Sequence, residues 1–559
     1  MGACCVTPPD TFIGVGTSHV VETVNIEMYI FNKATAALLQ SVPLDTFFGV
    51  PIGPTSTWFI TDPKVFFDAS SGHWYLALVG ASSGDNIGAM WLAASSTSDP
   101  TGSWIRWRFT TPLSVANSPP GTVGGRAIFP DYTQLGFTSD KIIVTGNGFE
   151  LLANGMFNNV YQGAQIWVIN KSDLVSGATP RNSFFQTGFF TMQPAQNLTA
   201  NARGFLASTG TTSLSYWTVD GLPPASVTLS AATTLAVASN GVPPSAAQPG
   251  TATLIDTGDQ RLTQAIWSNG SLWVAGNTSC TPTGDVALRS CARYTLVNTA
   301  GTPAVVQLFN LGAANSYYYY PAIMLDGSGS LVSVVNRSSA AEYPSVLATG
   351  RTALDPANTL TSPQLLKAGA GAYICVCGQN RWGDYSGAAL DPTDVASIWL
   401  AGEYAKAAVV PACVGCTVND DWGTWIARVK LPAIVGAGTY EDTSPAVAFA
   451  GSWVSWSDPG NSGGSARYSN DPAASAGLLF SGSSLTLVYV KQWNGGIATV
   501  TIDGAVVDQL DTYAATRLFQ QQKSYSVAAG AHTVSVAVSG NKNAASSGTY
   551  LIFDAFKVQ

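Results

Sequence analysis

Short apolar runs separated by glycine, proline or polar turns recur from the N-terminus to about residue 432. Residues 141–147 and 397–403 are examples, and both are rich in β-branched and aromatic side chains. Strict alternation of apolar and polar positions is missing from these runs, which is typical of strands that are buried on both faces. Glutamate and lysine are scarce over long stretches, so few amphipathic helices of ordinary length fit the chain. The pattern therefore predicts an all-β protein.

A weak internal repeat organises these runs. Residues 129–136 and 382–389 resemble one another, each contains an Asp-Tyr pair, and each is followed by two further apolar strands. Degenerate copies begin near residues 12, 62, 196, 264 and 320. About seven units of roughly 50 to 70 residues, with three or four short strands each, are what the blades of a propeller require. We predict a seven-bladed β-propeller over residues 1–432; a β-solenoid or several sandwiches are the alternatives.

The pattern changes after residue 432. Residues 433–439 are predicted to be a linker, and residues 440–559 contain alternating strands with glycine turns, as expected of a β-sandwich of the jelly-roll type. This segment resembles the galactose-binding-like modules that accompany many secreted carbohydrate-active proteins. The resemblance rests on Tyr440-Glu441-Asp442, Gly451-Ser452-Trp453, Ile502-Asp503-Gly504 and residues 551–556.

The first 432 residues in turn resemble secreted bacterial-type seven-bladed propellers, through Asp62-Pro63, residues 97–104 and the two Asp-Tyr repeats. Together the two resemblances imply a secreted protein whose partner is a polysaccharide or another glycan. They are architectural, and a fold does not by itself fix a function.

Charge is sparse and acidic. Only 10% of the residues are charged, and the formal net charge is -8, which disfavours nucleic acid or an anionic lipid surface as a partner. No window contains the roughly 18 consecutive apolar residues of a membrane span. The first five residues lack an apolar signal segment, so we expect a secreted protein whose leader has been removed.

Eight cysteines fall in clusters. Cys280 and Cys291 flank a polar turn, as expected of a disulfide that closes a loop between two strands. Cys375, Cys377, Cys413 and Cys416 fit either further disulfides, as in other extracellular proteins, or a four-thiolate zinc site. Five Asn-x-Ser/Thr sequons would be glycan acceptors in a eukaryotic source. They lie at Asn170, Asn197, Asn269, Asn277 and Asn336.

Two classes of function fit a propeller of this kind, namely a carbohydrate-active enzyme and a non-catalytic adhesin or lectin. Glycoside hydrolysis needs one carboxyl group that donates a proton and one that is ionised. The candidates are Asp62, Asp131, Asp384 and Glu403. Elimination beside a uronate needs a base and a cation instead. His73, Tyr132 or Tyr385 with Arg126 or Arg381 are available for it.

Aromatic side chains could stack on sugar rings. Trp382 and Tyr320 are the candidates in the propeller, and Trp453 and Trp493 are those in the C-terminal module, although strand packing explains all four equally well.

The repeat also predicts where the site lies. If Asp131 and Asp384 hold equivalent positions in two blades, radial symmetry brings both to the same end of the channel, and Asp62 should join them. Such carboxylates repel each other, so they need a cation such as Ca²⁺, an arginine or a shared proton. The structural alternative is that they only hydrogen-bond the backbone of neighbouring blades and close the ring.

Overall fold

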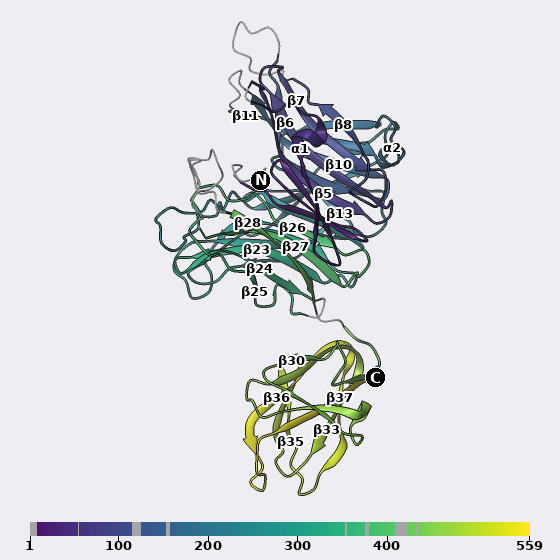
Figure 1. Cartoon of the computed structure of the whole chain (residues 1–559), viewed down its shortest axis with the longest axis vertical. Coiled ribbons are helices and arrows are strands. Elements are labelled where there is room, and N and C mark those ends of the chain that lie inside the picture. Colours follow the sequence, from purple (N-terminus) through teal and green to yellow (C-terminus); the bar gives the residue numbers. More distant parts are fainter. Residues whose placement is uncertain are drawn as a thin grey trace. The chain divides into compact units, whose positions relative to one another are not determined.

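The computed structural model describes residues 8–53, 55–113, 125–151, 157–352, 355–374, 380–407, 422–431 and 434–559. The chain divides into two compact units, the first formed by residues up to 351 together with 355–430, and the second beginning at Leu431. Strands make up nearly all of the regular structure in both units (Figure 1). Within the described residues, no helix has both the length and the apolar character that crossing a membrane requires.

In the first unit the described strands fall into seven successive antiparallel groups, or blades, three of which are joined into one sheet by parallel pairs between their first strands. Blade 1 contains β1 (Phe12–Val15), β2 (His19–Val24), β3 (Glu27–Asn32) and β4 (Leu38–Pro43). Blade 2 contains β5 (Trp58–Asp68), β6 (His73–Ser82), β7 (Ile87–Ser95) and β8 (Trp104–Thr110). Blade 3 contains β9 (Ile128–Phe137), β10 (Lys141–Leu151), β11 (Phe157–Asn170) and β12 (Asn182–Thr187).

The remaining blades follow the same plan. Blade 4 contains β13 (Gln193–Asn197), β14 (Gly204–Thr209), β15 (Ser213–Asp220), β16 (Thr228–Leu229) and β17 (Thr233–Ala236). Blade 5 contains β18 (Leu262–Ser268), β19 (Ser271–Cys280), β20 (Arg289–Asn298) and β21 (Ala304–Leu311). Blade 6 contains β22 (Ser316–Leu325), β23 (Leu331–Ser339), β24 (Glu342–Arg351) and β25 (Gln364–Lys367). Blade 7 contains β26 (Gly387–Leu390), β27 (Ser397–Ala405) and β28 (Trp422–Lys430), and the short helices α1 (Leu44–Phe48) and α2 (Lys171–Ser176) lie in blades 1 and 3.

The first strands of the blades form a closed ring. Each of β1, β5, β9, β13, β18 and β22 contacts the first strand of the next blade, and β26 of the last blade contacts β1. At the tightest point β13 pairs in parallel with both β9 and β18, which shows that these innermost strands run in the same direction around a common axis. Such radial closure is the arrangement of a β-propeller, and it confirms the all-β, seven-bladed fold class predicted from the sequence.

The core of the propeller lies between blades. One cluster joins Val21 and Ile30 of blade 1 to Val65 and Trp74 of blade 2, and another joins blade 2 to Ile142 and the rest of its neighbours in blade 3. Because each sheet is covered on both faces by neighbours, a strand such as β6 is buried from its second residue to its last. This explains why its sequence is a continuous apolar run.

The second unit is a β-sandwich with its own core, as predicted. Its strands are β29 (Gly438–Glu441), β30 (Ala448–Ala450), β31 (Val454–Ser457), β32 (Ser465–Ser469), β33 (Ser475–Lys491), β34 (Gly496–Ile502), β35 (Ala505–Asp511), β36 (Leu518–Lys542) and β37 (Leu551–Val558), with a single 3₁₀ turn, η1 (Ser462–Gly464). The long strands β33 and β36 pair with each other and each also pairs with other strands of the sandwich. Alternate residues of these strands point into one apolar core that includes Phe480, Leu487 and Phe553.

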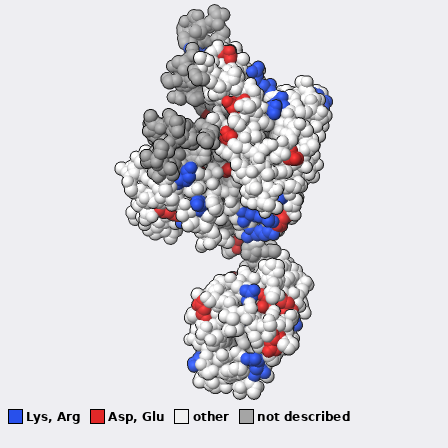
Figure 2. All heavy atoms as spheres, in the orientation of Figure 1, with Lys and Arg blue, Asp and Glu red and all other residues white. Residues whose placement is uncertain are grey.

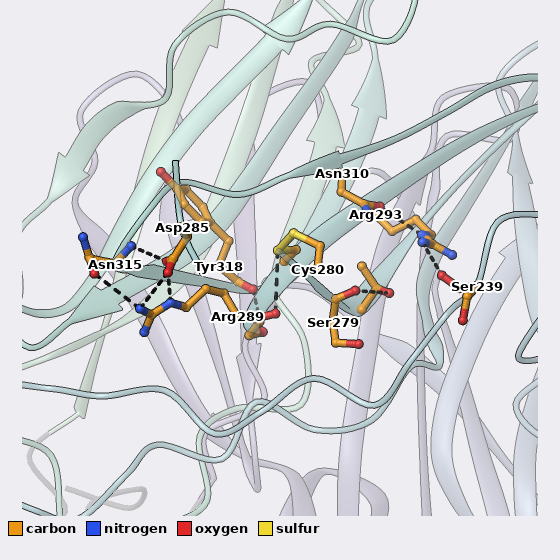
Figure 3. Close-up of a disulfide and its surroundings, with 12 residues drawn as sticks. Ser239, Ser279, Cys280, Asp285, Arg289, Arg293, Asn310, Asn315 and Tyr318 are labelled. Atoms are coloured by element: carbon orange, nitrogen blue, oxygen red, sulfur yellow. Dashed lines mark hydrogen bonds and ion pairs between the residues drawn. A yellow bond between two sulfur atoms is a disulfide. The ribbon is translucent and has the colours of Figure 1, made fainter. Parts of the chain in front are cut away.

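A disulfide joins Cys280 at the end of β19 to Cys291 on β20, with 5.9 Å between the Cα atoms, as the sequence predicted. Figure 3 shows the bond beside Arg289, whose Nε lies 2.7 Å from Oδ2 of Asp285 in the intervening loop. The disulfide and the ion pair therefore hold the same hairpin. Cys4, Cys5, Cys375, Cys377, Cys413 and Cys416 lie outside the described residues.

Charged side chains are few on the face drawn in Figure 2, where Lys and Arg as well as Asp and Glu are scattered among uncharged residues.

Candidate functional site

The first strands of several blades contain a backbone irregularity near their middle. In blades 2, 3 and 6 the pairing with the second strand shifts register at this place. The non-glycine residues there have positive φ, with 57° at Asp62, 63° at Tyr132 and 51° at Tyr320. Positive φ is uncommon for such residues and is kept only where the surroundings enforce it. These bulges bring their neighbouring side chains to one end of the ring.

Hydrogen bonds between neighbouring blades support the bulges. Oδ2 of Asp62 accepts a bond from the backbone N–H of Tyr132 at 2.8 Å, and the N–H of Asp62 donates to Oδ1 of Asn25 at 2.9 Å. Oδ1 of Asp10 accepts from the N–H of Asp384 at 2.6 Å, which links the first blade to the last. Asp62 and Asp10 thus close the ring, as the structural alternative expected of Asp62.

A polar cavity of about 330 Å³ lies at this end of the ring. We call it the mouth cavity; its lining consists of Asp131, Tyr132, Asp256, Gly258, Asp259, Arg261, Asn277, Tyr320, Arg381 and Asp384. Five of these residues were candidates in the sequence, and the repeated Asp131 and Asp384 do meet there. Asp256, Gly258, Asp259 and Arg261 come from the segment that precedes β18, which the sequence analysis did not single out.

Two arginine–aspartate pairs fix charge on the cavity wall. Arg381 binds Oδ2 of Asp384 at 2.7 Å and lies 4.0 Å from Oδ2 of Asp256. Arg261 donates to both carboxylate oxygens of Asp259, at 2.8 and 2.7 Å. Burial acts to raise the pKa of Asp259, but the hydrogen bonds from Arg261 outweigh it and hold that pKa below its ordinary value. The Asp259 carboxylate is therefore ionised at neutral pH.

Asp131 differs from these paired aspartates. In the described part of the chain its carboxyl group has neither an ion pair nor a hydrogen bond to another side chain. Burial, followed by the negative charge of Asp62, raises its pKa to about 7, while Arg261 acts in the opposite direction. A carboxyl group with this pKa carries a proton in slightly acidic solution, so it can serve as a proton donor.

Tyr132 and Tyr320 form aromatic walls. The Arg261 guanidinium lies over the ring of Tyr132 at 4.5 Å from its centroid, and the hydroxyl of Tyr320 donates to the backbone oxygen of Asp256 at 3.4 Å. Burial raises the pKa of both tyrosines well above the ordinary value. They are therefore neutral and poor bases. Each is only 2% exposed, so their role is to support the cavity wall by packing and hydrogen bonding.

Three of the sequence candidates are buried away from the cavity. Glu403 accepts a hydrogen bond from the N–H of Gly383 at 2.7 Å and is 2% exposed. Trp382 is fully buried against Tyr319 and Tyr373, and Tyr385 is 1% exposed. The positions of these side chains do not support the prediction that they contact a ligand, because neighbouring residues around the axis cover them.

Two other candidates lie elsewhere. Arg126 precedes β9 next to Ala127, whose N–H bonds Asn86 of blade 2, and it is not among the residues that line the cavity. His73 pairs with Asp68 at the far end of β5. Six residues of strand separate Asp68 from Asp62, or roughly 20 Å, so this imidazole cannot act in the mouth cavity.

The candidate tryptophans of the sandwich differ in exposure. Trp453 is half-buried, packs on Phe449 with 5.3 Å between ring centroids, and donates from Nε1 to the backbone oxygen of Ala450. Trp493 is 48% exposed, and the Arg517 guanidinium lies 5.0 Å from its ring centroid. Only Trp493 of this pair presents a large surface to solvent.

The residues that the sequence analysis missed had a detectable signal. Asp259 and Arg261 come just before β18. The similarity of residues 132–134 to residues 262–264 places Arg261 at the position that Asp131 occupies within β9 of blade 3. Aligning all blade starts, instead of the two clearest ones, would have pointed to them. Asp10 had no such signal because its partner Asp384 is 374 positions away.

In the described ranges, no group of three or more His, Cys, Asp or Glu side chains has the arrangement of a metal site. The four cysteines proposed as zinc ligands lie outside those ranges. Arg261 and Arg381 instead balance the negative charge of Asp259 and Asp384 in the cavity.

No protein-family model matches the chain, and no curated protein matches it. An exo-β-1,3-galactanase from Phanerochaete chrysosporium, solved with β-1,3-galactotriose, is 12% identical over 99% of this chain and 96% of its own, with a TM-score of 0.27. A Paenibacillus xanthan lyase is 12% identical over 98% of this chain and 52% of its own, with a TM-score of 0.24. An ACO/RPE65 chimera is 14% identical over 66% and 75%, with a TM-score of 0.36. At these TM-scores the similarities place the chain in no family.

Proposed function

We propose that the mouth cavity binds an uncharged sugar of an extracellular glycan and hydrolyses its glycosidic bond, with Asp131 as the proton donor. The observation that carries this proposal is the contrast between carboxyl groups within one cavity. Asp131 has a pKa raised to about 7, whereas Asp384 and Asp259 are held by arginines. Glycosidases need such a pair, one carboxyl group protonated and one ionised.

In this mechanism Asp131 protonates the oxygen of the leaving group as the glycosidic bond breaks. Asp384, oriented by Arg381, then supplies the negative charge that stabilises positive charge developing on the sugar ring, or activates the attacking water. Asp256 and Asp259 accept hydrogen bonds from its hydroxyl groups.

Hydrolysis fits the cavity better than elimination beside a uronate. Four aspartates and two arginines line the cavity, so carboxylates outnumber guanidinium groups and an anionic sugar would be repelled. Elimination also needs a base, and the two lining tyrosines have pKa values raised well above the ordinary value. An uncharged sugar is therefore the substrate class that we infer.

For the sandwich we propose an accessory role in holding the glycan, on the surface around Trp493. The exposed indole and the adjacent Arg517 offer a flat apolar face beside hydrogen-bond donors. A secreted or cell-surface location follows from a glycan partner and remains part of the proposal. A lectin without catalysis is the alternative, and it differs in that Asp131 would affect binding but no bond would break.

The test uses the purified full chain with a panel of neutral polysaccharides, and measures both binding and release of reducing ends. Asp131→Asn and Asp384→Asn should each lower turnover by roughly 10²- to 10⁴-fold, the range that loss of acid–base catalysis produces. Asp220→Asn is the matched control, because Asp220 pairs with Arg203 on the surface of blade 4. Binding without release of reducing ends would favour the lectin, and the absence of both would reject the proposal.

A further inference from the structure

A buried lysine lies next to the axis of the propeller. Lys64 follows Asp62 and Pro63 on β5 and is 1% exposed. Its Nζ lies 3.0 Å from the ring centroid of Tyr385 and 4.2 Å from that of Phe12. Within the described residues this nitrogen has no hydrogen-bond partner. A buried, unpaired charge of this kind is costly and calls for nearby compensation.

The negative charges of three carboxylates, each from a different blade, act on Lys64. They are Asp10 of blade 1, Asp62 of blade 2 and Asp384 of blade 7. The backbone N–H groups of Asp384 and Tyr132 hold Asp10 and Asp62 in place. The other charged groups that act on these carboxylates include Arg381, which binds Asp384, and Arg261 of blade 5, whose charge also interacts with Asp384. Asp131 of blade 3 interacts with Asp62 through its charge.

Burial works against the charged forms of Lys64, Asp62 and Asp10. Burial lowers the pKa of Lys64 well below its ordinary value, and Asp62, Asp10 and Asp384 act against that lowering. Burial raises the pKa of Asp62 and of Asp10, and neighbouring aspartates add to the increase. Each of these carboxylates would be costly to bury ionised without a positive charge close by.

We propose that Lys64 is the internal counter-ion of the propeller ring, a buried amino group caged by Phe12 and Tyr385 that balances the negative charge of Asp10, Asp62 and Asp384 and helps to hold them in position. The two aromatic faces stabilise the ammonium group through cation–π contacts. The three carboxylates supply the negative charge that the uncharged rings of Phe12 and Tyr385 lack. Arg381 pairs with Asp384 from the side of the mouth cavity. Lys64 and Arg381 therefore balance the charge of the aspartates from two directions.

Lys64 is thereby a positioning residue for the mouth cavity, because Asp384 both lines that cavity and interacts with the charge of Lys64. This last step alone rests on the proposed function. The counter-ion role itself concerns the folding of the ring, so it can be tested whether or not the chain hydrolyses a glycan.

A double-mutant cycle tests the proposal on the full chain. Lys64→Met keeps a long unbranched side chain without charge, and Asp62→Asn keeps an oxygen that can accept from Tyr132. At pH 8 we expect Lys64→Met to raise the unfolding equilibrium constant of the natural chain. In the Asp62→Asn background the same substitution should raise it by a factor that is at least ten times smaller. At pH 4 the difference should shrink, because protonation of Asp62 then removes from the natural chain the charge that the Asp62→Asn background already lacks.

Lys171→Met provides the matched control. Lys171 is also buried but pairs with Asp68 at the other end of β5, so its substitution should combine additively with Asp62→Asn. If Lys64→Met does not fold, Lys64→Gln enters the same cycle. Additive effects of the Lys64 and Asp62 substitutions, or a coupling that is the same at both pH values, would overturn the proposal. A coupled cycle in a chain that releases no reducing ends would reject only the proposed function.

Discussion

Replacing Glu22 by glutamine should stabilise the propeller at alkaline pH. Glu22 lies on β2, is 3% exposed, and its Oε1 accepts a hydrogen bond from Oγ1 of Thr11 at 2.9 Å. Burial raises its pKa to about 7, although the hydroxyls of Thr424 and Thr11 act against the increase. In the unfolded chain the same group has an ordinary pKa near 4.5. The folded protein therefore holds a proton on Glu22 that the unfolded chain has already released.

The magnitude follows from the difference between these two pKa values. Because the folded state binds the extra proton, stability is fully present below pH 4.5 and is lost as the pH rises towards 7. At about 1.4 kcal/mol per pKa unit, the complete loss is about 3 kcal/mol. Glutamine carries no charge at any pH, so the variant should avoid this loss. For a unit the size of the propeller, about 3 kcal/mol corresponds to about 3 °C in Tm.

The assay is thermal unfolding of the full chain and of Glu22→Gln at pH 4.5 and pH 8.5. Unfolding is monitored by calorimetry, so that the transition of the propeller is resolved from that of the sandwich. We expect nearly equal Tm values at the lower pH and a higher Tm for the variant at the higher pH. An equal shift at both pH values would show that the substitution changes packing instead of removing a buried charge. A variant that is less stable at pH 8.5 would refute the reasoning.

Three further predictions concern the architecture. Replacing Cys280 and Cys291 together by serine should destabilise the propeller by about 3 kcal/mol, since the bond closes a short loop, and an unchanged denaturation midpoint would show that the bond adds nothing. A fragment of residues 437–559 should be soluble and β-rich by circular dichroism, because the sandwich has its own core; an unfolded fragment beside a stable full chain would place the boundary elsewhere. Secreted from a eukaryotic host, the folded chain should carry an N-glycan only at Asn269, which is exposed on a hairpin turn, as peptide mass spectrometry can check. The other four sequon asparagines are buried, and their Nδ2 atoms donate hydrogen bonds to backbone oxygens; they are Asn170, Asn197, Asn277 and Asn336. A glycan on any of these four would contradict the prediction.

The fold was predictable because each blade repeats the same local pattern. Residues 141–147 and 397–403 are continuous apolar runs, and both became second strands with neighbouring sheets on their two faces. The equivalence of Asp131 and Asp384 likewise followed from two similar segments, and radial symmetry then required them to lie at the same end of the ring.

The misassigned residues show what a repeat cannot reveal. Trp382 and Tyr385 occupy the same segment as Asp384 but turn inward, where they pack around the axis. Lys64 follows Asp62 by two positions and resembles a surface lysine in the sequence, yet it is 1% exposed. Which side chain points along the axis and which lines the cavity depends on the bulges of the first strands, and the local sequence does not determine that choice.

The pH dependence of glycan hydrolysis tests the central claim most directly. For the full chain acting on a neutral polysaccharide, release of reducing ends should decline as the pH rises through about 7, because Asp131 with its raised pKa loses the proton that it must donate. In Asp131→Asn the rate should fall by at least about 100-fold and this decline should disappear, while Tm at pH 6 stays close to that of the natural chain. Full activity of Asp131→Asn, with the same decline near pH 7, would contradict the assignment of Asp131 as the proton donor of the mouth cavity.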